Sequence, residues 1–213
     1  MTFYDRFYKV CYYLVRAVFG VFYPMKIIGA ENIPHGAAMV CCNHSSMADP
    51  FLVALAFGKN GHVHIIAKVE IFKIPIVSQL LRKLRMISVD RGVLDGTTIK
   101  SALGYLKNNE KVIIFPEGTR VAQDDSTSAK TGAVKLAERA GVPVLPIYLP
   151  RRKPLFRKTL IVIGVPYLIE KQTPRRTPGD YELLSNALME NIKSLGPSRS
   201  MTGQEAQLGI RNS

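Results

Sequence analysis

Apolar residues along the chain fall into short runs that alternate with longer segments of helical periodicity. The short runs are predicted strands, at residues 37–42, 62–67, 86–89, 111–115, 142–149 and 160–165. The longer segments fit helices over residues 51–58, 71–84, 96–107, 130–140 and 180–195. Strands separated by helices are typical of parallel pairing. We therefore predict an α/β fold with a mostly parallel central sheet flanked by helices.

Proline and glycine refine several of these elements. Pro75 should begin or kink the helix in which it lies, and Asp95 suits the N-cap of the next one. Gly141 should end the helix before it. Pro143 and Pro146 lack amide hydrogens. Their run is therefore predicted to be an edge or irregular strand.

The N-terminal segment has a different pattern. Aromatic and aliphatic side chains crowd residues 10–23, with basic residues around them at Arg6, Lys9, Arg16 and Lys26. The run is interrupted and shorter than the roughly 20 apolar residues that span a bilayer. An aromatic-rich helix with basic flanks fits a membrane interface, although a helix docked on a soluble core has the same pattern. We predict a membrane-associating helical segment over residues 1–28, a folded domain over 29–196 and a disordered tail over 197–213.

Composition and charge limit the classes of ligand that this chain is expected to bind. The chain has 213 residues, enough for one domain with a real core, and its 29 basic against 16 acidic residues give a net charge of +13. Such a charge attracts nucleic acid, an anionic membrane or a phosphorylated substrate. Tryptophan is absent and the aromatics gather near the N-terminus, which disfavours a single-strand nucleic-acid binder. The three cysteines have no zinc-site spacing, so we expect buried thiols and no metal site.

A polar string follows the first predicted strand. His44 falls in the turn between this strand and the next helix, where α/β folds place their chemistry. Asp49 lies about one turn into that helix and can reach back to the imidazole, and a histidine oriented by a carboxylate is a general base. Asn43, Ser45 and Asp49 are also typical of turns and helix caps. On this stretch alone both interpretations stand.

Two other predicted strands also end in polar groups. One leads into Asp90 and Arg91, and the other leads into residues 116–120. If these strand ends lie on one side of the sheet, they form one site with the histidine. Arginine binds phosphate bidentately, Gly118 would let the backbone approach an anion, and Thr119 adds a hydroxyl donor. Glu117 is more suited to orienting an arginine than to touching phosphate.

Motifs of other enzyme classes are missing from the sequence. It has no Walker loop, no Gly-x-Gly-x-x-Gly after a strand and no Gly-x-Ser-x-Gly elbow. Nucleotide hydrolysis, hydride transfer and serine hydrolysis therefore lack their usual devices.

Taken in order, the polar strings resemble the motifs of the glycerolipid acyltransferase family. Residues 44–49 match its His-x4-Asp signature, and residues 115–120 match its second hallmark, Phe-Pro-Glu-Gly-Thr-Arg. Residues 89–91 resemble the block between these two, and residues 142–147 resemble the fourth block. Order and spacing agree over about residues 37–150, most closely with the bacterial 1-acyl-sn-glycerol-3-phosphate acyltransferase type.

The resemblance implies transfer of a fatty acyl group from acyl-CoA or acyl carrier protein to the sn-2 hydroxyl of a 1-acylglycerol 3-phosphate. His44 would deprotonate that hydroxyl, Asp49 would orient His44, and backbone amides near the start of the helix would stabilise the oxyanion. No cofactor besides the acyl donor, and no metal, is implied. The residues grouped at the acceptor phosphate are Lys68, Arg91, Glu117, Gly118, Thr119 and Arg120.

The expected partners are a lysophospholipid acceptor, the acyl donor and a membrane surface, with no nucleic acid. The expected location is the cytoplasmic face of the cell membrane, as a peripheral or monotopic protein. One alternative is another acceptor, such as glycerol 3-phosphate, another lysophospholipid or a lyso-ornithine lipid. A second is a non-enzymatic binder of anionic membranes or nucleic acid that uses the basic loop over residues 151–158.

Overall fold

A seven-stranded sheet organises the chain in a computed structural model that describes residues 2–90, 94–121 and 129–197. Its strands are β1 (Met25–Ile28), β2 (Ala38–Cys42), β3 (Val63–Lys68), β4 (Ile87–Val89), β5 (Lys111–Ile114), β6 (Val144–Tyr148) and β7 (Thr159–Ile163). Their order across the sheet is β1-β7-β6-β2-β5-β3-β4, and only the β6–β7 pair is antiparallel. The predicted mostly parallel sheet is confirmed.

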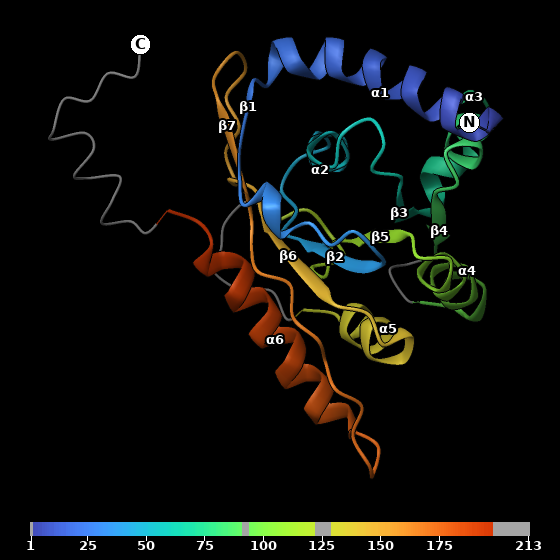
Figure 1. Cartoon of the computed structure of the whole chain (residues 1–213), viewed down its shortest axis with the longest axis vertical. Helices are drawn as coiled ribbons and strands as arrows, with labels where there is room; N and C mark the ends of the chain where they lie inside the picture. Colours follow the sequence, from blue (N-terminus) through green and yellow to red (C-terminus); the bar gives the residue numbers. More distant parts are fainter. Residues whose placement is uncertain (1, 91–93, 122–128, 198–213) are drawn as a thin grey trace, which may run out of the picture.

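Helices cover both faces of this sheet (Figure 1). They are α1 (Phe3–Phe22), α2 (Asp49–Ala56), α3 (Pro75–Lys83), α4 (Gly96–Lys107), α5 (Gly132–Ala140) and α6 (Pro178–Ser194), with short 3-10 helices at Ala30–Asn32 and Val69–Lys73. One apolar core lies between the sheet and α4, α5 and α6. A second core lies under α2 and the C-terminal end of α1.

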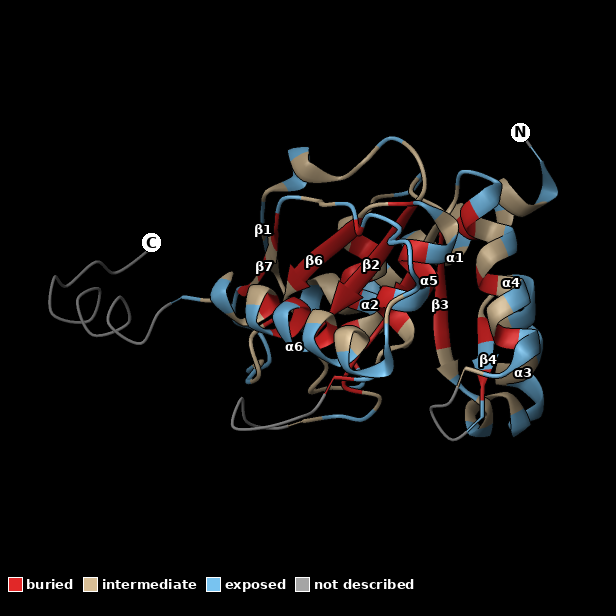
Figure 2. Cartoon of the chain, turned by 90° about the horizontal axis from the view of Figure 1, so that it is seen from below, coloured by how far each residue is buried: buried red, intermediate tan, exposed pale blue. Residues whose placement is uncertain are grey.

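Strand β2 joins these two cores, because all five of its residues are buried. Met39 and Cys41 pack toward α4, α5 and α6, whereas Val40 and Cys42 pack toward α2. Figure 2 shows β2 and β6 as buried strands behind helices whose outer faces are exposed. The expected burial of the thiols holds for Cys41 and Cys42, while Cys11 is partly exposed.

Local signals placed several boundaries correctly. Pro75 is the first residue of α3, and the Asp95 side chain caps α4 by accepting a hydrogen bond from the backbone N–H of Thr98. Gly141 ends α5 in the left-handed conformation, with φ of 67°. These positions follow from proline's missing amide hydrogen, the free amides of a helix start and glycine's tolerance of positive φ.

The prediction of an edge or irregular strand over residues 142–149 is wrong, because β6 lies between β7 and β2. Pro143 precedes the strand. The Pro146 carbonyl accepts from the backbone N–H of Gly164, so the ring nitrogen also points toward β7. Pairing between β6 and β7 covers only two residue pairs beyond this point. The missing amide hydrogen therefore leaves the pairing with β2 intact.

The predicted helical segment over residues 1–28 also needs correction. Its helix ends at Phe22, and residues 25–28 form β1, which is an edge strand paired with β7. In the part of the chain that the structure describes, no helix is long and apolar enough to cross a membrane. The tail over residues 197–213 was predicted to be disordered. All of it except Pro197 lies outside the described residues.

The carboxyl ends of β2 and β6 are joined by one buried amide side chain. The Asn43 side chain donates to the Leu149 carbonyl at 2.7 Å and accepts from the Leu149 backbone N–H at 2.8 Å. Asn43 is 1% exposed, so water cannot replace these bonds. This amide holds the turn that carries His44 against the segment that follows β6.

We expect Asn43→Ala to lower the free energy of unfolding by about 2–4 kcal/mol, because it leaves a buried donor and a buried acceptor unpaired. Urea unfolding followed by circular dichroism measures this. Asn186→Ala, on the exposed surface of α6, is the matched control. A loss no larger than that of the control would show that the amide does not hold the two strand ends together.

Candidate active site

The turn after β2 folds around one buried carboxylate. Asp49 Oδ2 lies 2.9 Å from His44 Nδ1 and accepts the backbone N–H groups of Ser45 and Ser46 at 2.7 Å each. Asp49 is the first residue of α2, rather than lying one turn into it as predicted. Since the carboxylate is an acceptor, Nδ1 is the donor, and in the neutral imidazole Nε2 then keeps its lone pair. The predicted pairing of His44 with Asp49 is confirmed.

This arrangement changes the expectation for the oxyanion. The amides of Ser45 and Ser46 bind the carboxylate of Asp49, so they are not available to a tetrahedral intermediate. They instead fix the carboxylate at the lip of the sheet. The Phe115 ring stacks on the face of the His44 imidazole, with 4.3 Å between the ring centroids, and so limits rotation of that imidazole.

Lys153 completes the surroundings of Asp49. Its ammonium lies 2.7 Å from Asp49 Oδ1 and donates to Ser45 Oγ at 2.8 Å, and its side chain is 2% exposed. Burial raises the pKa of Asp49, yet the hydrogen bond from His44, the charge of Lys153 and the Ser45 amide outweigh it and hold that pKa below its usual value. Asp49 is therefore ionised at neutral pH.

A second buried carboxylate holds the backbone of His44. Glu117 Oε2 accepts the His44 backbone N–H at 2.7 Å, and both carboxylate oxygens bind the Arg151 guanidinium. Arg151 also donates to the carbonyl oxygens of His44 and Val121. Glu117 was grouped with the phosphate-binding residues but expected to orient an arginine rather than to touch phosphate, and its contacts with Arg151 agree with that expectation. Both of its oxygens are occupied, so it orients an arginine and positions His44.

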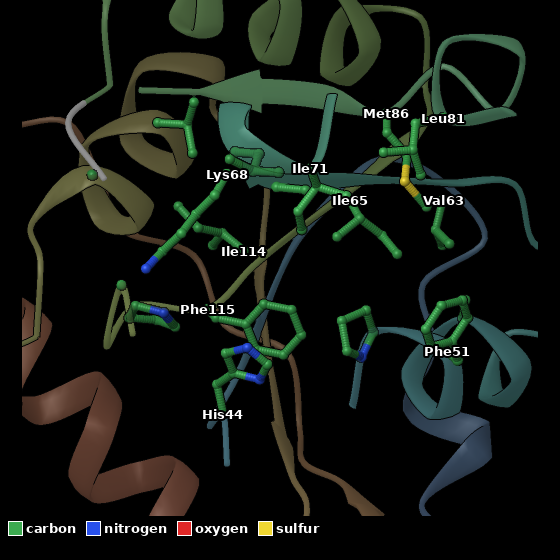
Figure 3. A pocket seen from close by; sticks show the side chains of 18 of the residues that line it. His44, Phe51, Val63, Ile65, Lys68, Ile71, Leu81, Met86, Ile114 and Phe115 are labelled. Atoms are coloured by element: carbon green, nitrogen blue, oxygen red, sulfur yellow. The ribbon is translucent and has the colours of Figure 1, made fainter. Parts of the chain in front are cut away.

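The histidine faces a cavity of about 1690 Å³ that reaches from the strand ends to α1 and α3. Figure 3 shows His44 and Phe115 in one part of it, with Lys68 extending from β3 on that side. Apolar side chains line the other part: Phe51, Val63, Ile65, Leu81 and Met86. The cavity thus combines a polar end with a long apolar interior.

Most of the predicted phosphate-binding residues line the same cavity. They are Lys68, Gly118, Thr119 and Arg120, whereas Arg91 lies outside the described residues. Gly118 has a φ of 65°, and a Cβ there would come within 2.6 Å of Lys130 Cε. This left-handed backbone conformation favours glycine. Further cations at the cavity wall, which the sequence did not single out, are Lys130, Lys135 and Arg139.

Comparison with known proteins agrees with this geometry. The sequence model of the Acyltransferase family matches residues 24–150, well over half of the chain. The chain belongs to the acyltransferase family. The match covers β1 through the end of β6, and thus both buried carboxylates, His44 and the phosphate-binding candidates.

Individual relatives extend the likeness over the chain. A 1-acyl-sn-glycerol-3-phosphate acyltransferase of Bacillus subtilis is 29% identical over 197 residues, which is 88% of this chain and 96% of that protein. An enzyme of the same name from Pseudomonas aeruginosa is 32% identical over 63% of this chain and 52% of its own length. The crystal structure of the 1-acyl-sn-glycerophosphate acyltransferase PlsC from Thermotoga maritima aligns with a TM-score of 0.60 and 25% identity, over 99% of this chain and 80% of that one.

The ion pair of Lys153 predicts a change in the pH profile of this acyltransferase. In Lys153→Met, burial of Asp49 persists while the nearest cation is gone, so the pKa of Asp49 rises. Asp49 then takes up a proton at higher pH, and a neutral carboxyl no longer stabilises the imidazolium. We expect the acid limb of the kcat/KM profile to move to higher pH.

Arg152→Met is the matched control, because Arg152 is the neighbouring residue in sequence and its side chain is exposed. It removes one positive charge without touching Asp49, so its acid limb should stay with that of the wild type. An unshifted limb in folded Lys153→Met would mean that Lys153 does not control the ionisation of the dyad.

Proposed function

We propose that this chain transfers a fatty acyl group from a thioester donor, acyl-CoA or acyl carrier protein, to the sn-2 hydroxyl of 1-acylglycerol 3-phosphate. The product is phosphatidic acid, the precursor of membrane phospholipids. The observation that carries the proposal is the position of the His44–Asp49 pair, at the polar end of a cavity whose interior is apolar. The names of the similar proteins support the same acceptor.

The reaction uses His44 Nε2 as a general base. It takes the proton of the acceptor hydroxyl while that oxygen attacks the thioester carbonyl, and Asp49 stabilises the imidazolium that forms. The tetrahedral intermediate then collapses, the carbon–sulfur bond breaks, and the thiolate takes the proton back from His44. The ester and a free thiol are the products. Base catalysis of this kind contributes roughly 10²–10⁴-fold to the rate.

Neither serine beside the base acts as a nucleophile in this scheme. Ser45 Oγ accepts a hydrogen bond from the Lys153 ammonium, and Ser46 Oγ accepts the backbone N–H of Ala48. Both hydroxyls thus have structural partners within the turn. The acyl group therefore passes directly from donor to acceptor, without an acyl-enzyme.

The cations at the cavity wall suit the phosphate of the acceptor. Lys68 and Arg120 both line the cavity, and at Gly118 the backbone carries no side chain of its own, with the Lys130 side chain lying close to it. The apolar interior suits the two acyl chains. We expect no metal and no cofactor besides the acyl donor.

Helix α1 supports an association with a membrane surface. Its exposed side carries a stripe of apolar residues at helical spacing: Phe3, Val10, Leu14, Val18 and Val21, of which Leu14 also lines the edge of the cavity. Tyr8, on its other side, is buried. A helix of this kind lies in the interface and brings lipid substrates to the cavity, which α1 helps to line. We place the enzyme at the cytoplasmic face of the cell membrane, as a peripheral or monotopic protein.

The non-enzymatic alternative gives no role to the ion pairs of two of the basic residues on which it relied. It relied on the basic loop over residues 151–158, yet Arg151 and Lys153 face inward and bind Glu117 and Asp49. The experiment below distinguishes 1-acylglycerol 3-phosphate from the other acceptors that members of the family use.

Release of thiol from palmitoyl-CoA or palmitoyl-acyl carrier protein in detergent micelles tests the proposal. We expect release to depend on 1-oleoylglycerol 3-phosphate and to fall at least about 100-fold in His44→Ala, because the base is gone. His35→Ala, at an exposed histidine, should behave like the wild type.

Reactions without acceptor, and with acceptors other than 1-oleoylglycerol 3-phosphate, make the result decisive. Release without any acceptor would identify a thioesterase instead. Equal release with 1-oleoylglycerol, which lacks the phosphate, would contradict recognition of the phosphate. Faster release with glycerol 3-phosphate, or with another lysophospholipid or lyso-ornithine lipid, would contradict the proposed acceptor.

A further inference from the structure

The segment that joins β6 to β7 has two sides with different roles. Arg151 and Lys153 point inward and form buried ion pairs with the two carboxylates of the site. Nearer its tip, this hairpin segment carries exposed cations and large apolar side chains: Arg152, Leu155, Phe156, Arg157 and Lys158. The outer side thus joins two large apolar side chains with three cations.

One exposed apolar residue of this segment, Phe156, is held in place by contacts with α1. Phe156 is 65% exposed and Leu155 is 52% exposed. Phe156 has a φ of 60°, an uncommon conformation for a bulky residue. Its backbone N–H donates to the Phe22 carbonyl at 2.7 Å, and its ring lies 5.4 Å from that of Phe22. The end of α1 therefore fixes an aromatic ring that gains little from burial within the fold.

The position of this tip matches the exposed side of α1. In Figure 1 the turn between β6 and β7 rises beside the C-terminal end of α1, to the same outer level as the helix. The exposed residues Val18, Val21 and Phe22 continue the apolar surface from the helix to Phe156. A flat surface that touches α1 along its length would therefore also touch the hairpin tip.

The charge around the hairpin tip indicates which kind of partner this surface contacts. Arg152, Arg157 and Lys158 flank the apolar tip, and the β1 residue Lys26 is exposed beside β7, paired in register with Leu160. Cations around inserted apolar side chains match an anionic bilayer, with phosphates above and acyl chains below. A protein of net charge +13 adds long-range attraction to the same surface.

We propose that the outer side of the β6–β7 hairpin is a second membrane-contact element, which binds anionic lipid headgroups through its cations and inserts Leu155 and Phe156 between them. The orientation rests on the membrane contact proposed above for α1. With two contacts in one plane, the enzyme lies in a single orientation on the bilayer. Because Arg151 and Lys153 lie on the inner side of the same hairpin, the His44–Asp49 pair then keeps a fixed position relative to the bilayer surface.

Sedimentation of the full chain with phosphatidylglycerol–phosphatidylcholine vesicles tests this surface. We expect Leu155→Ser/Phe156→Ser to weaken binding at least about tenfold, because two apolar side chains no longer insert. Arg157→Gln/Lys158→Gln should weaken it by roughly 10–30-fold and flatten its salt dependence. Binding of the wild type to pure phosphatidylcholine vesicles should be far weaker than to the anionic ones.

Matched controls lie away from this surface. Val165→Ser/Leu168→Ser removes two equally exposed apolar residues beyond β7, and Lys171→Gln/Arg175→Gln removes two exposed cations. All four variants are compared by thermal unfolding, so a loss of fold is seen separately. Equal effects of hairpin and control variants, or unchanged binding by the hairpin variants, would overturn the inference. So would a hairpin that affects binding of duplex DNA but not of vesicles.

These outcomes are separate from a failure of the proposed reaction. Absence of thiol release by the wild type in detergent would contradict the acyl transfer, whatever the vesicles show. Unchanged vesicle binding by the hairpin variants would contradict the second contact, whatever the thiol assay shows.

Discussion

The buried carboxylate of Asp49 is the constraint on which the site depends. A charge taken out of water is costly unless other groups replace its hydration. Here the two serine amides, His44 and Lys153 supply those groups, so the charge can persist only if the turn, the imidazole and the ammonium keep their places. The same contacts that stabilise the carboxylate therefore orient the His44 imidazole.

The second buried ion pair, between Glu117 and Arg151, connects the ends of three strands. Glu117 follows β5, Arg151 follows β6, and both bind the backbone of His44, which follows β2. Three strand ends are thereby tied at His44, the residue that we propose takes up the proton. Since Arg151 and Lys153 both come from the β6–β7 hairpin, one segment positions both carboxylates of the site. The apolar tip of that hairpin lies beside α1, which links the site to the proposed membrane surface.

The order of the elements, several helix ends and the core of the site could be predicted from the sequence, because these features depend on residues close together in the chain. The alternation of elements, the caps Asp95 and Gly141 and the spacing of His44 and Asp49 depend on neighbouring residues. Contacts across more than 100 residues of sequence carry no such signal. Lys153 and exposed Arg152 are adjacent in one basic run, and only the path of the hairpin distinguishes them. The interior position of β6 was missed for a similar reason, because the effect of Pro146 depends on which neighbour its nitrogen faces.

The central claim is that Asp49 holds His44 with a proton on Nδ1 and a free lone pair on Nε2. Nitrogen-15 NMR of histidine-labelled protein at neutral pH measures this directly, with His44→Gln used to assign the signals. The account predicts a protonated, hydrogen-bonded Nδ1 and an unprotonated Nε2, and loss of this preference in Asp49→Asn. A proton on Nε2 in the wild type, or the same tautomer in both proteins, would contradict the account.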